Sequence, residues 1–111
     1  MALPQEKWVV YNLMYITKKD NPLDASKMML EMSEENLHSD LVKQDVLILT
    51  GAEDHFIPIK MHHKQVNALT NANSITEKIF TREEQGQNHC QIGNFGLAVD
   101  VMAKWIKNHS E

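Results

Sequence analysis

Residues 46–58, VLILTGAEDHFIP, decide how this chain folds. The run at residues 46–50 is short and apolar, and it ends at Gly51. Such a run is typical of a strand buried on both faces, as in a parallel sheet. A segment with helical spacing then extends from Pro58 to about residue 70. The apolar face of this segment carries Ile59, His62 or His63, Val66 and Leu69.

A second strand and a second helix follow along the chain. Residues 74–81, SITEKIFT, alternate, with Ile75 and Ile79 on one face and Phe80 on the other, which predicts a strand. After a polar loop, residues 95–108 have the spacing of an amphipathic helix. The order strand, helix, strand, helix implies a crossover connection, so we expect an α/β fold with a parallel strand pair.

Helical patterns dominate the chain before the first strand. Residues 5–17 follow a proline, which is favoured in the first turn of a helix. Asn21 precedes another proline and is suited to cap a second helix. A serine at position 33 can cap a third, short helix over residues 34–41. Residues 1–41 are therefore predicted to be a helical lead-in to the strand–helix part at 45–108.

Composition limits the class of protein. With 111 residues, of which 42% are hydrophobic and 23% charged, the chain has the balance of one globular domain spanning residues 1–111. A net charge of −4 argues against nucleic-acid binding, which needs a basic face. The sequence has neither a membrane-spanning apolar run nor a signal peptide, and Cys90 has no cysteine partner. We expect a cytoplasmic protein without nucleic-acid or membrane partners.

An acid and a histidine follow the two predicted strands. Glu53 and Asp54 stand in the loop after the first strand, and His89 stands in the loop after the second. In a parallel α/β sheet these loops meet at the carboxyl ends of the strands, where catalytic groups gather. A carboxylate there can accept a hydrogen bond from the imidazole and fix its tautomer. The candidate acid–base pair is Asp54 with His89, and Glu53 is the alternative acid.

Two stretches resemble the C-terminal part of an α/β-hydrolase. Residues 46–58 resemble the segment that delivers the catalytic acid in that family. Residues 88–106, NHCQIGNFGLAVDVMAKWI, resemble the segment with the catalytic histidine and a final helix that ends in a Trp–aliphatic pair. The helical lead-in and the His–Cys pair are similar to the acylaminoacyl-peptidase-like and pseudooxynicotine-hydrolase-like branch. The resemblance implies a partial α/β-hydrolase fold with Asp54 and His89 as members of a Ser–Asp–His triad.

The nucleophile of that triad is missing from the sequence. In the family it stands in G-x-S-x-G. None of the serines, at positions 26, 33, 39, 74 and 110, has glycine two residues before and after it. We therefore expect the C-terminal portion of an ester- or amide-bond hydrolase for a small molecule or peptide, inactive alone. The alternative is a non-catalytic assembly module that forms homo-oligomers, or binds a chain with the missing half, through an exposed sheet edge.

The remaining polar candidates are expected to be structural. Five further histidines are predicted to be surface groups: His38, His55, His62, His63 and His109. A metal site built from His55, His62 and His63 is disfavoured, because adjacent helical residues point about 100° apart. No carboxylate or cysteine stands at a ligand-like spacing from them either. We predict no metal ion and no cofactor.

The cysteine and the aromatic residues are expected to pack in the interior. Cys90 is predicted to be a buried, inert thiol rather than a nucleophile. Phe95 and Trp105 are predicted to anchor the last helix in the core. The aromatic side chains of the first helix are expected to pack against other elements, with the lining of a substrate cap as the alternative. These are Trp8, Tyr11 and Tyr15.

Overall fold

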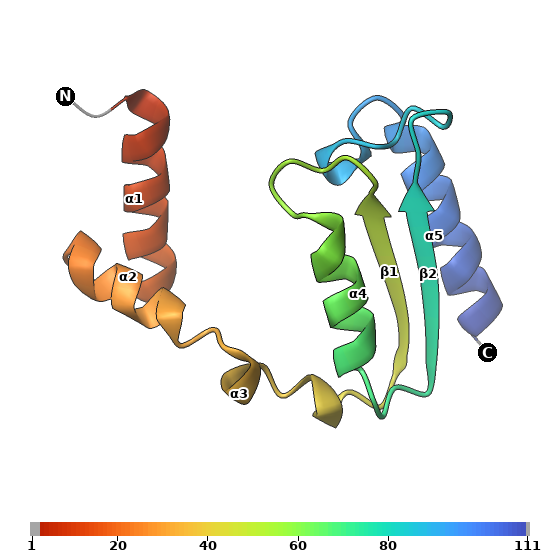
Figure 1. Cartoon of the computed structure of the whole chain (residues 1–111), viewed down its shortest axis with the longest axis horizontal. Coiled ribbons are helices and arrows are strands. Elements are labelled where there is room, and N and C mark those ends of the chain that lie inside the picture. The colour runs from red at the N-terminus through yellow and green to blue at the C-terminus, as the bar shows by residue number, and fades with distance from the viewer. Residues whose placement is uncertain (1–2, 111) are drawn as a thin grey trace. The chain divides into compact units, whose positions relative to one another are not determined.

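The computed structural model describes residues 3–110. The chain divides into two compact units, one ending at His38 and the other beginning at Ser39. Helices are the regular elements described in the first unit, and the second unit contains the two described strands (Figure 1). Mixed α/β structure is therefore confirmed, with helices leading into a strand–helix–strand–helix order as the sequence predicts.

The first unit contains helices α1 (Pro4–Thr17), α2 (Pro22–Leu30) and α3 (Glu34–Leu37). The cap of α2 is the predicted one, because the Asn21 side chain accepts a hydrogen bond from the Asp24 N–H at 2.9 Å. The third helix is shorter than expected. It ends at a left-handed residue, and a separate 3₁₀ turn (Ser39–Leu41) opens the second unit.

The aromatic side chains of α1 are exposed rather than packed. Trp8 is 67%, Tyr11 68% and Tyr15 83% exposed, so the prediction that they pack is wrong. The helix contacts α2, yet none of its own residues is buried. In α2 only the small side chain of Ala25 is buried, so the contact between the two helices encloses little apolar surface.

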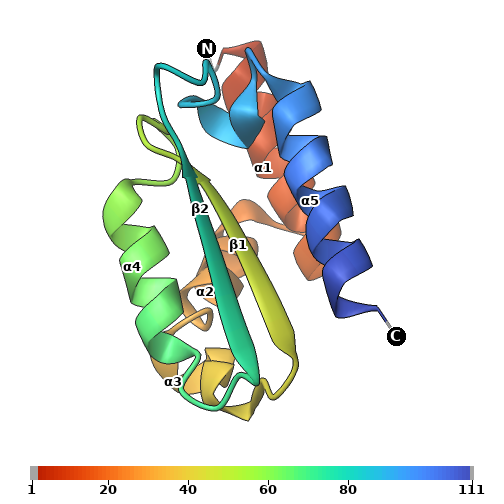
Figure 2. The same cartoon turned by 90° about the vertical axis from the view of Figure 1, so that its right-hand side faces the viewer.

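The second unit is a two-stranded parallel sheet with a helix on each face. Its elements are β1 (Asp45–Gly51), α4 (Ile59–Ala68), β2 (Ser74–Phe80) and α5 (Phe95–His109). The strands pair in parallel register, as predicted. Figures 1 and 2 show α4 and α5 on opposite sides of the strands.

Side-chain contacts identify the face that each helix covers. Thr50 of β1 contacts His62 of α4, whereas Thr76 of β2 accepts a hydrogen bond from the Trp105 Nε1–H of α5 at 3.1 Å. Because side chains alternate along a strand, Glu77 lies on the α4 face and Phe80 on the α5 face. Phe80 is fully buried, and it is the largest side chain in the core of this unit.

Strand β1 is less buried than its sequence predicts. Residues 45–49 are only half-buried, while Thr50 and Gly51 are buried. β1 has a helix on each face, as expected of such a strand, but its burial is less complete than predicted, because it has one neighbouring strand and a free edge among the described residues. Phe95, expected in the core, is 63% exposed, and Trp105 is half-buried.

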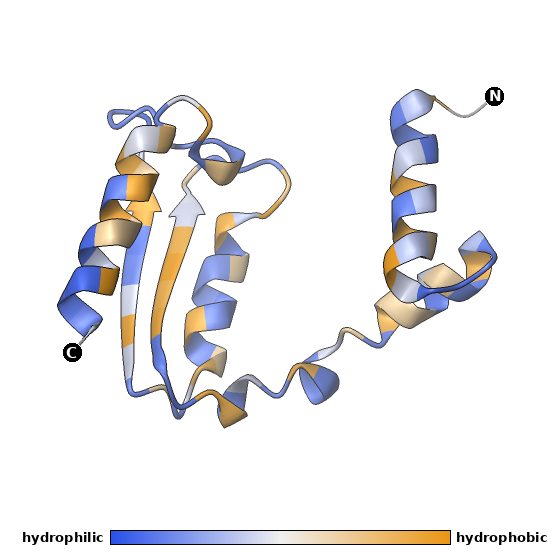
Figure 3. Cartoon of the chain, turned by 180° about the vertical axis from the view of Figure 1, so that it is seen from behind, coloured by the Kyte–Doolittle hydropathy of each residue, from blue (hydrophilic) through white to orange (hydrophobic). Residues whose placement is uncertain are grey.

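Apolar residues are spread over both units. Figure 3 shows β1 as a hydrophobic strand beside the more polar β2, and helices with mixed surfaces. Within residues 3–110, no helix combines the length and the hydrophobicity that crossing a membrane requires.

Candidate functional site

The loops that follow β1 and β2 are held against each other by backbone hydrogen bonds. The Ala52 N–H donates to the Phe80 carbonyl at 2.9 Å, and the Glu53 N–H donates to the Gln87 carbonyl at 2.9 Å. These bonds continue the pairing of the strands beyond their carboxyl ends. The two loops that carry the predicted acid and histidine are thereby fixed side by side.

Gly51 permits this close approach. A Cβ atom at this position would lie 2.4 Å from the Gln87 carbonyl oxygen and 2.6 Å from the Asn88 carbonyl oxygen. Both distances are far below an ordinary carbon–oxygen contact, and both obstacles are backbone atoms that have no rotamer to change. The glycine at the end of β1 thus sets the spacing between the loop of Asp54 and the loop of His89.

Asp54 is held by its own loop. Its Oδ1 accepts hydrogen bonds from the N–H groups of Phe56 (2.8 Å) and Ile57 (2.9 Å). Only 7% of its side chain is exposed. Burial raises the pKa of this carboxyl, but the hydrogen bonds from Ile57, His89 and Phe56 outweigh burial and hold the pKa below its ordinary value. Asp54 is therefore ionised at neutral pH and can only accept hydrogen bonds.

His89 completes the pair that the sequence predicts. Its Nδ1 lies 2.8 Å from Asp54 Oδ2, and the Phe56 ring meets the imidazole edge to face at 4.9 Å between centroids. Since the carboxylate is an acceptor, Nδ1 carries the proton, and the neutral ring has its lone pair on Nε2. No group within residues 3–110 forms a hydrogen bond with Nε2. With 38% of its side chain exposed, His89 can present that nitrogen to a reactant.

The loop around His89 contains several residues in the left-handed region. Gln85, Cys90 and Gln91 have φ between 54° and 58°, a conformation that costs energy for residues other than glycine. The Cys90 side chain is exposed, so the prediction of a buried thiol is wrong. Such strain is commonest at functional loops, and here it adjoins the candidate histidine.

Glu53 takes no part in the pair. Its carboxylate lies 2.8 Å from the Arg82 guanidinium in an exposed ion pair between the two loops. Of the two acids that the sequence offers, only Asp54 contacts His89. The ion pair adds a second connection between the loops, of the weak kind typical of surface pairs.

The prediction that His62 lies at the surface is wrong. This side chain is 2% exposed and lies between the sheet and α4. Its Nδ1 is 2.7 Å from Thr50 Oγ1, and its Nε2 is 2.8 Å from Glu77 Oε1. The signal was present, because His62 is three residues after Ile59 on the apolar face of α4. His63, the next residue, fits the apolar spacing of the helix equally well, so spacing alone does not show which of the two histidines is buried.

The other histidines are exposed, as predicted: His38, His55, His63 and His109. One group in the described part of the chain has the ligand types and proximity for a metal ion. It consists of His62, His63 and Glu77, whose potential ligand atoms lie within 4.8 Å of one another. Glu77 lies 15 positions after His62, so local sequence spacing does not predict its place in this group.

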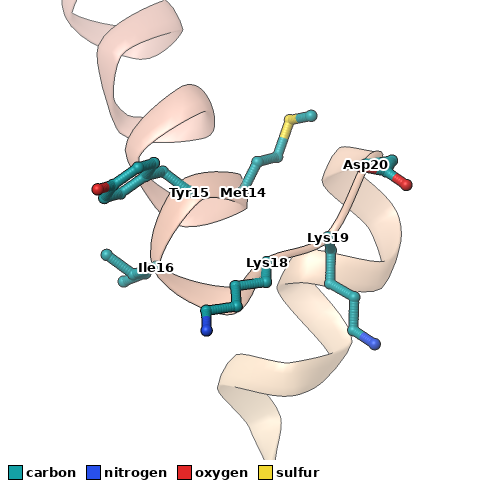
Figure 4. Close-up of a pocket in the computed structure, with 6 residues that line it drawn as sticks. All are labelled: Met14, Tyr15, Ile16, Lys18, Lys19 and Asp20. Atoms are coloured by element: carbon teal, nitrogen blue, oxygen red, sulfur yellow. The ribbon is translucent and has the colours of Figure 1, made fainter.

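The first unit contains an open depression of about 750 Å³ at the end of α1 (Figure 4). It is lined by Met14, Tyr15, Ile16, Lys18, Lys19 and Asp20. None of these side chains is a histidine, cysteine or serine. The candidate acid–base pair, Asp54 with His89, lies in the loops of the second unit.

Comparisons of the chain with protein-family models, with curated proteins and with solved structures find no significant match. The Asp54–His89 pair is therefore interpreted from its own geometry. A buried, ionised carboxylate on Nδ1 and an unpaired Nε2 make an imidazole that can accept a proton from a nucleophile and return it to a leaving group.

Proposed function

We propose that residues 45–108 supply the acid–base part of an α/β-hydrolase active site, in which Asp54 orients His89. One observation carries the proposal: the 2.8 Å hydrogen bond between Asp54 Oδ2 and His89 Nδ1. It joins loops at the carboxyl ends of two adjacent parallel strands, the position where α/β folds gather catalytic groups. The loop order, acid first and histidine second, is also that of the α/β-hydrolase triad.

In this proposal His89 acts as general base and then as general acid. Its Nε2 takes the proton of a serine hydroxyl as the oxygen attacks an ester or amide carbonyl. The same nitrogen then gives the proton to the leaving alcohol or amine. Asp54 stays ionised throughout, keeps Nδ1 protonated and stabilises the imidazolium formed between the two transfers.

The serine comes from outside residues 1–111, either from another part of the polypeptide or from another chain. Serines inside this chain have other partners or lie on other elements: Ser26 and Ser110 donate to helix carbonyls, and Ser74 donates to Asp45. A buried acceptor near the site, Gln87 Oε1, has no hydrogen-bond partner within residues 3–110. Since buried acceptors are nearly always satisfied, this orphan favours a further element over the loops.

The free edge and partial burial of β1 support the same conclusion. An apolar parallel strand normally has neighbours on both edges and cover on both faces, whereas β1 has one neighbouring strand within residues 3–110 and residues that are mostly half-buried. A strand from the nucleophile-bearing part would pair with this edge. The shared edge would hold the serine close to the two loops.

The first experiment determines which ring nitrogen of His89 carries the proton. Long-range ¹H–¹⁵N NMR of the chain is expected to show His89 as the tautomer with the proton on Nδ1, and Asp54→Ala should abolish that preference. Glu53→Ala, which removes the neighbouring acid, is the matched control and should leave it unchanged. A proton on Nε2 of the neutral ring in the unaltered chain would contradict the proposal.

The second experiment tests the missing nucleophile. The chain alone should neither hydrolyse activated short-chain esters nor react with a fluorophosphonate probe for active serines. In a protein that unites it with a G-x-S-x-G segment, from the upstream coding sequence or a partner chain, His89→Ala should reduce kcat on the order of 10⁴-fold or more. His109→Gln, an exposed control, should retain activity. Esterase turnover by the chain alone that His89→Ala abolishes would refute an external nucleophile.

A second candidate function is a non-catalytic assembly module, favoured by the same free edge of β1. Unpaired backbone groups on an apolar strand are a template for another strand. If the partner is a second copy, the chain forms homodimers or larger homo-oligomers. Light scattering at high concentration distinguishes this case, since a strictly monomeric mass would rule it out.

A further inference from the structure

A second cluster of reactive side chains lies on the α4 face of the sheet. It contains His62 and His63 of α4 and Glu77 of β2, and its potential ligand atoms lie within 4.8 Å of one another. None of these residues belongs to the Asp54–His89 pair. The cluster unites two imidazoles and a carboxylate, the ligand types of many three-residue zinc sites.

His62 is the fixed member of this cluster. It is 2% exposed, and both of its ring nitrogens have partners: Thr50 Oγ1 at Nδ1 and Glu77 Oε1 at Nε2. In one neutral form the Thr50 hydroxyl donates to Nδ1 and Nε2–H donates to Glu77. In the other tautomer Nδ1–H donates to Thr50 Oγ1, and Nε2 directs its lone pair at the carboxylate. A hydroxyl both donates and accepts, so the buried ring keeps a partner at Nδ1 in both forms.

We propose that His62 Nε2, a ring nitrogen of His63 and the Glu77 carboxylate bind a zinc ion, with water as the fourth ligand. On binding, the ring proton of His62 moves from Nε2 to Nδ1, so the imidazole stays neutral and the metal takes the proton's place between nitrogen and carboxylate. Thr50 then accepts the Nδ1–H bond. This is the outer hydrogen bond that commonly orients a metal-bound histidine.

The geometry requires a small opening of the cluster that its exposed members can provide. Zinc–ligand bonds of about 2.0–2.2 Å at tetrahedral angles place ligand atoms about 3.4 Å apart. The present distance between His62 Nε2 and Glu77 Oε1 is 2.8 Å. Glu77, with 46% of its side chain exposed, and His63, which is exposed, are free to adjust around the buried ring.

Zinc binding would connect α4 directly to β2. Helix α4 contacts β1 more than β2, and the link from His62 to Glu77 is a single hydrogen bond. A zinc ion would connect the helix to β2 through three side chains. Because it binds only the folded arrangement, it would raise the thermal midpoint of unfolding as its concentration rises above its Kd.

The test is zinc titration calorimetry on the full chain carrying Cys90→Ser, which removes an exposed thiol, because thiolates are zinc ligands in their own right. We expect saturable binding of one ion per chain. His63→Ala and Glu77→Gln, substitutions at exposed positions, should each raise the Kd about 10–100-fold or more. His55→Ala and His109→Ala remove exposed histidines outside the cluster and should leave the Kd unchanged. Cobalt(II) should give the visible absorption of a tetrahedral site, and both ligand variants should lose it.

Three outcomes would overturn the proposal. The first is the absence of saturable zinc binding at micromolar concentrations in a chain whose circular dichroism shows it folded. The second is binding that His63→Ala and Glu77→Gln both leave intact. The third is binding lost on His55→Ala, which would locate the ion at the loop beside Asp54 instead.

Discussion

Replacing Gly51 with alanine should separate the two loops of the candidate site. The new Cβ would start 2.4 Å from the Gln87 carbonyl oxygen. An ordinary contact begins at 3.4 Å, so the backbone must move by 3.4 − 2.4 = 1.0 Å. The Glu53 N–H bond to the same carbonyl, now 2.9 Å long, lies in the path of that movement. A shift of this size between reacting groups costs on the order of 100-fold in catalysis.

The expected loss of stability follows from three contributions. Overpacking against atoms that cannot change rotamer costs about 1–3 kcal/mol, and weakening one hydrogen bond costs about 0.5–1.5 kcal/mol. Alanine in place of glycine recovers about 0.5–1 kcal/mol through the unfolded chain. The net destabilisation of Gly51→Ala is therefore about 0.5–4 kcal/mol. Alanine readily adopts the φ and ψ angles of a strand, so the destabilisation comes from the steric contact of the new Cβ and not from backbone strain.

Urea unfolding measures this loss in the unit that contains the site. In a Trp8→Phe background, Trp105 is the only tryptophan, and its fluorescence reports on the second unit. Gly96→Ala is the matched control, because a Cβ there meets nothing within 4 Å and Gly96 lies in helix α5. This control should stabilise the chain by about 0.5–1 kcal/mol.

The reasoning is refuted if Gly51→Ala unfolds at the same urea concentration as the parent chain and His89 keeps its proton on Nδ1. That result would mean that the loops tolerate an added methyl group at their closest approach. Destabilisation by Gly96→Ala of similar size would instead show that any added side chain is harmful. In that case the contact between Gly51 and Gln87 would have no special role.

Further predictions concern the core, a helix cap, acid stability and the thiol. Phe80→Ala should destabilise the second unit by about 3–5 kcal/mol in urea unfolding, since Phe80 is fully buried. A loss below 1 kcal/mol would mean that the surrounding side chains move to fill the space that the ring leaves. Asn94→Ala should cost about 1–2 kcal/mol in the same assay, because the side chain accepts from Leu97 N–H and donates to the Glu84 carbonyl. Burial raises the pKa of Asp54, but its hydrogen bonds lower the pKa by more, so the folded-state pKa lies below the unfolded one. The contribution of Asp54 to the free energy of unfolding is therefore complete above the unfolded pKa and is lost as the pH falls through the folded-state pKa. Unfolding followed from pH 5 downward should show that loss, and Asp54→Asn should flatten it; an unchanged slope would exclude Asp54 as its source. Cys90 should react with an aromatic disulfide reagent in the native chain at nearly its rate in urea, and protection of the native thiol would contradict its exposure.

Local periodicity predicted the elements of this fold, and chain topology predicted the meeting of Asp54 with His89. The apolar run and the alternating segment became β1 and β2 within a residue or two of their expected ends. Parallel pairing then brought their following loops together, so the order of elements was enough to place an acid beside a histidine. That these two residues are catalytic stays a prediction.

Burial and long-range partners were not predictable from the same patterns. The apolar composition of β1 predicts a position away from solvent. Its actual half-burial depends on which other elements pack beside it. Phe95 has the spacing of a core residue and is nevertheless exposed. The partners of His62 come from two strands, and which of two adjacent histidines faces them depends on the rotation of α4 about its axis.

The bond between Asp54 and His89 joins residues that are 35 positions apart. No shorter piece of chain can form it, because the two loops meet only after α4 has crossed over and the parallel strands have paired. Contacts of such long sequence separation are slow to form, since the intervening chain must be ordered first. We therefore expect the acid–base pair to be assembled late in folding, so that partly folded chains would contain an exposed imidazole without its orienting carboxylate.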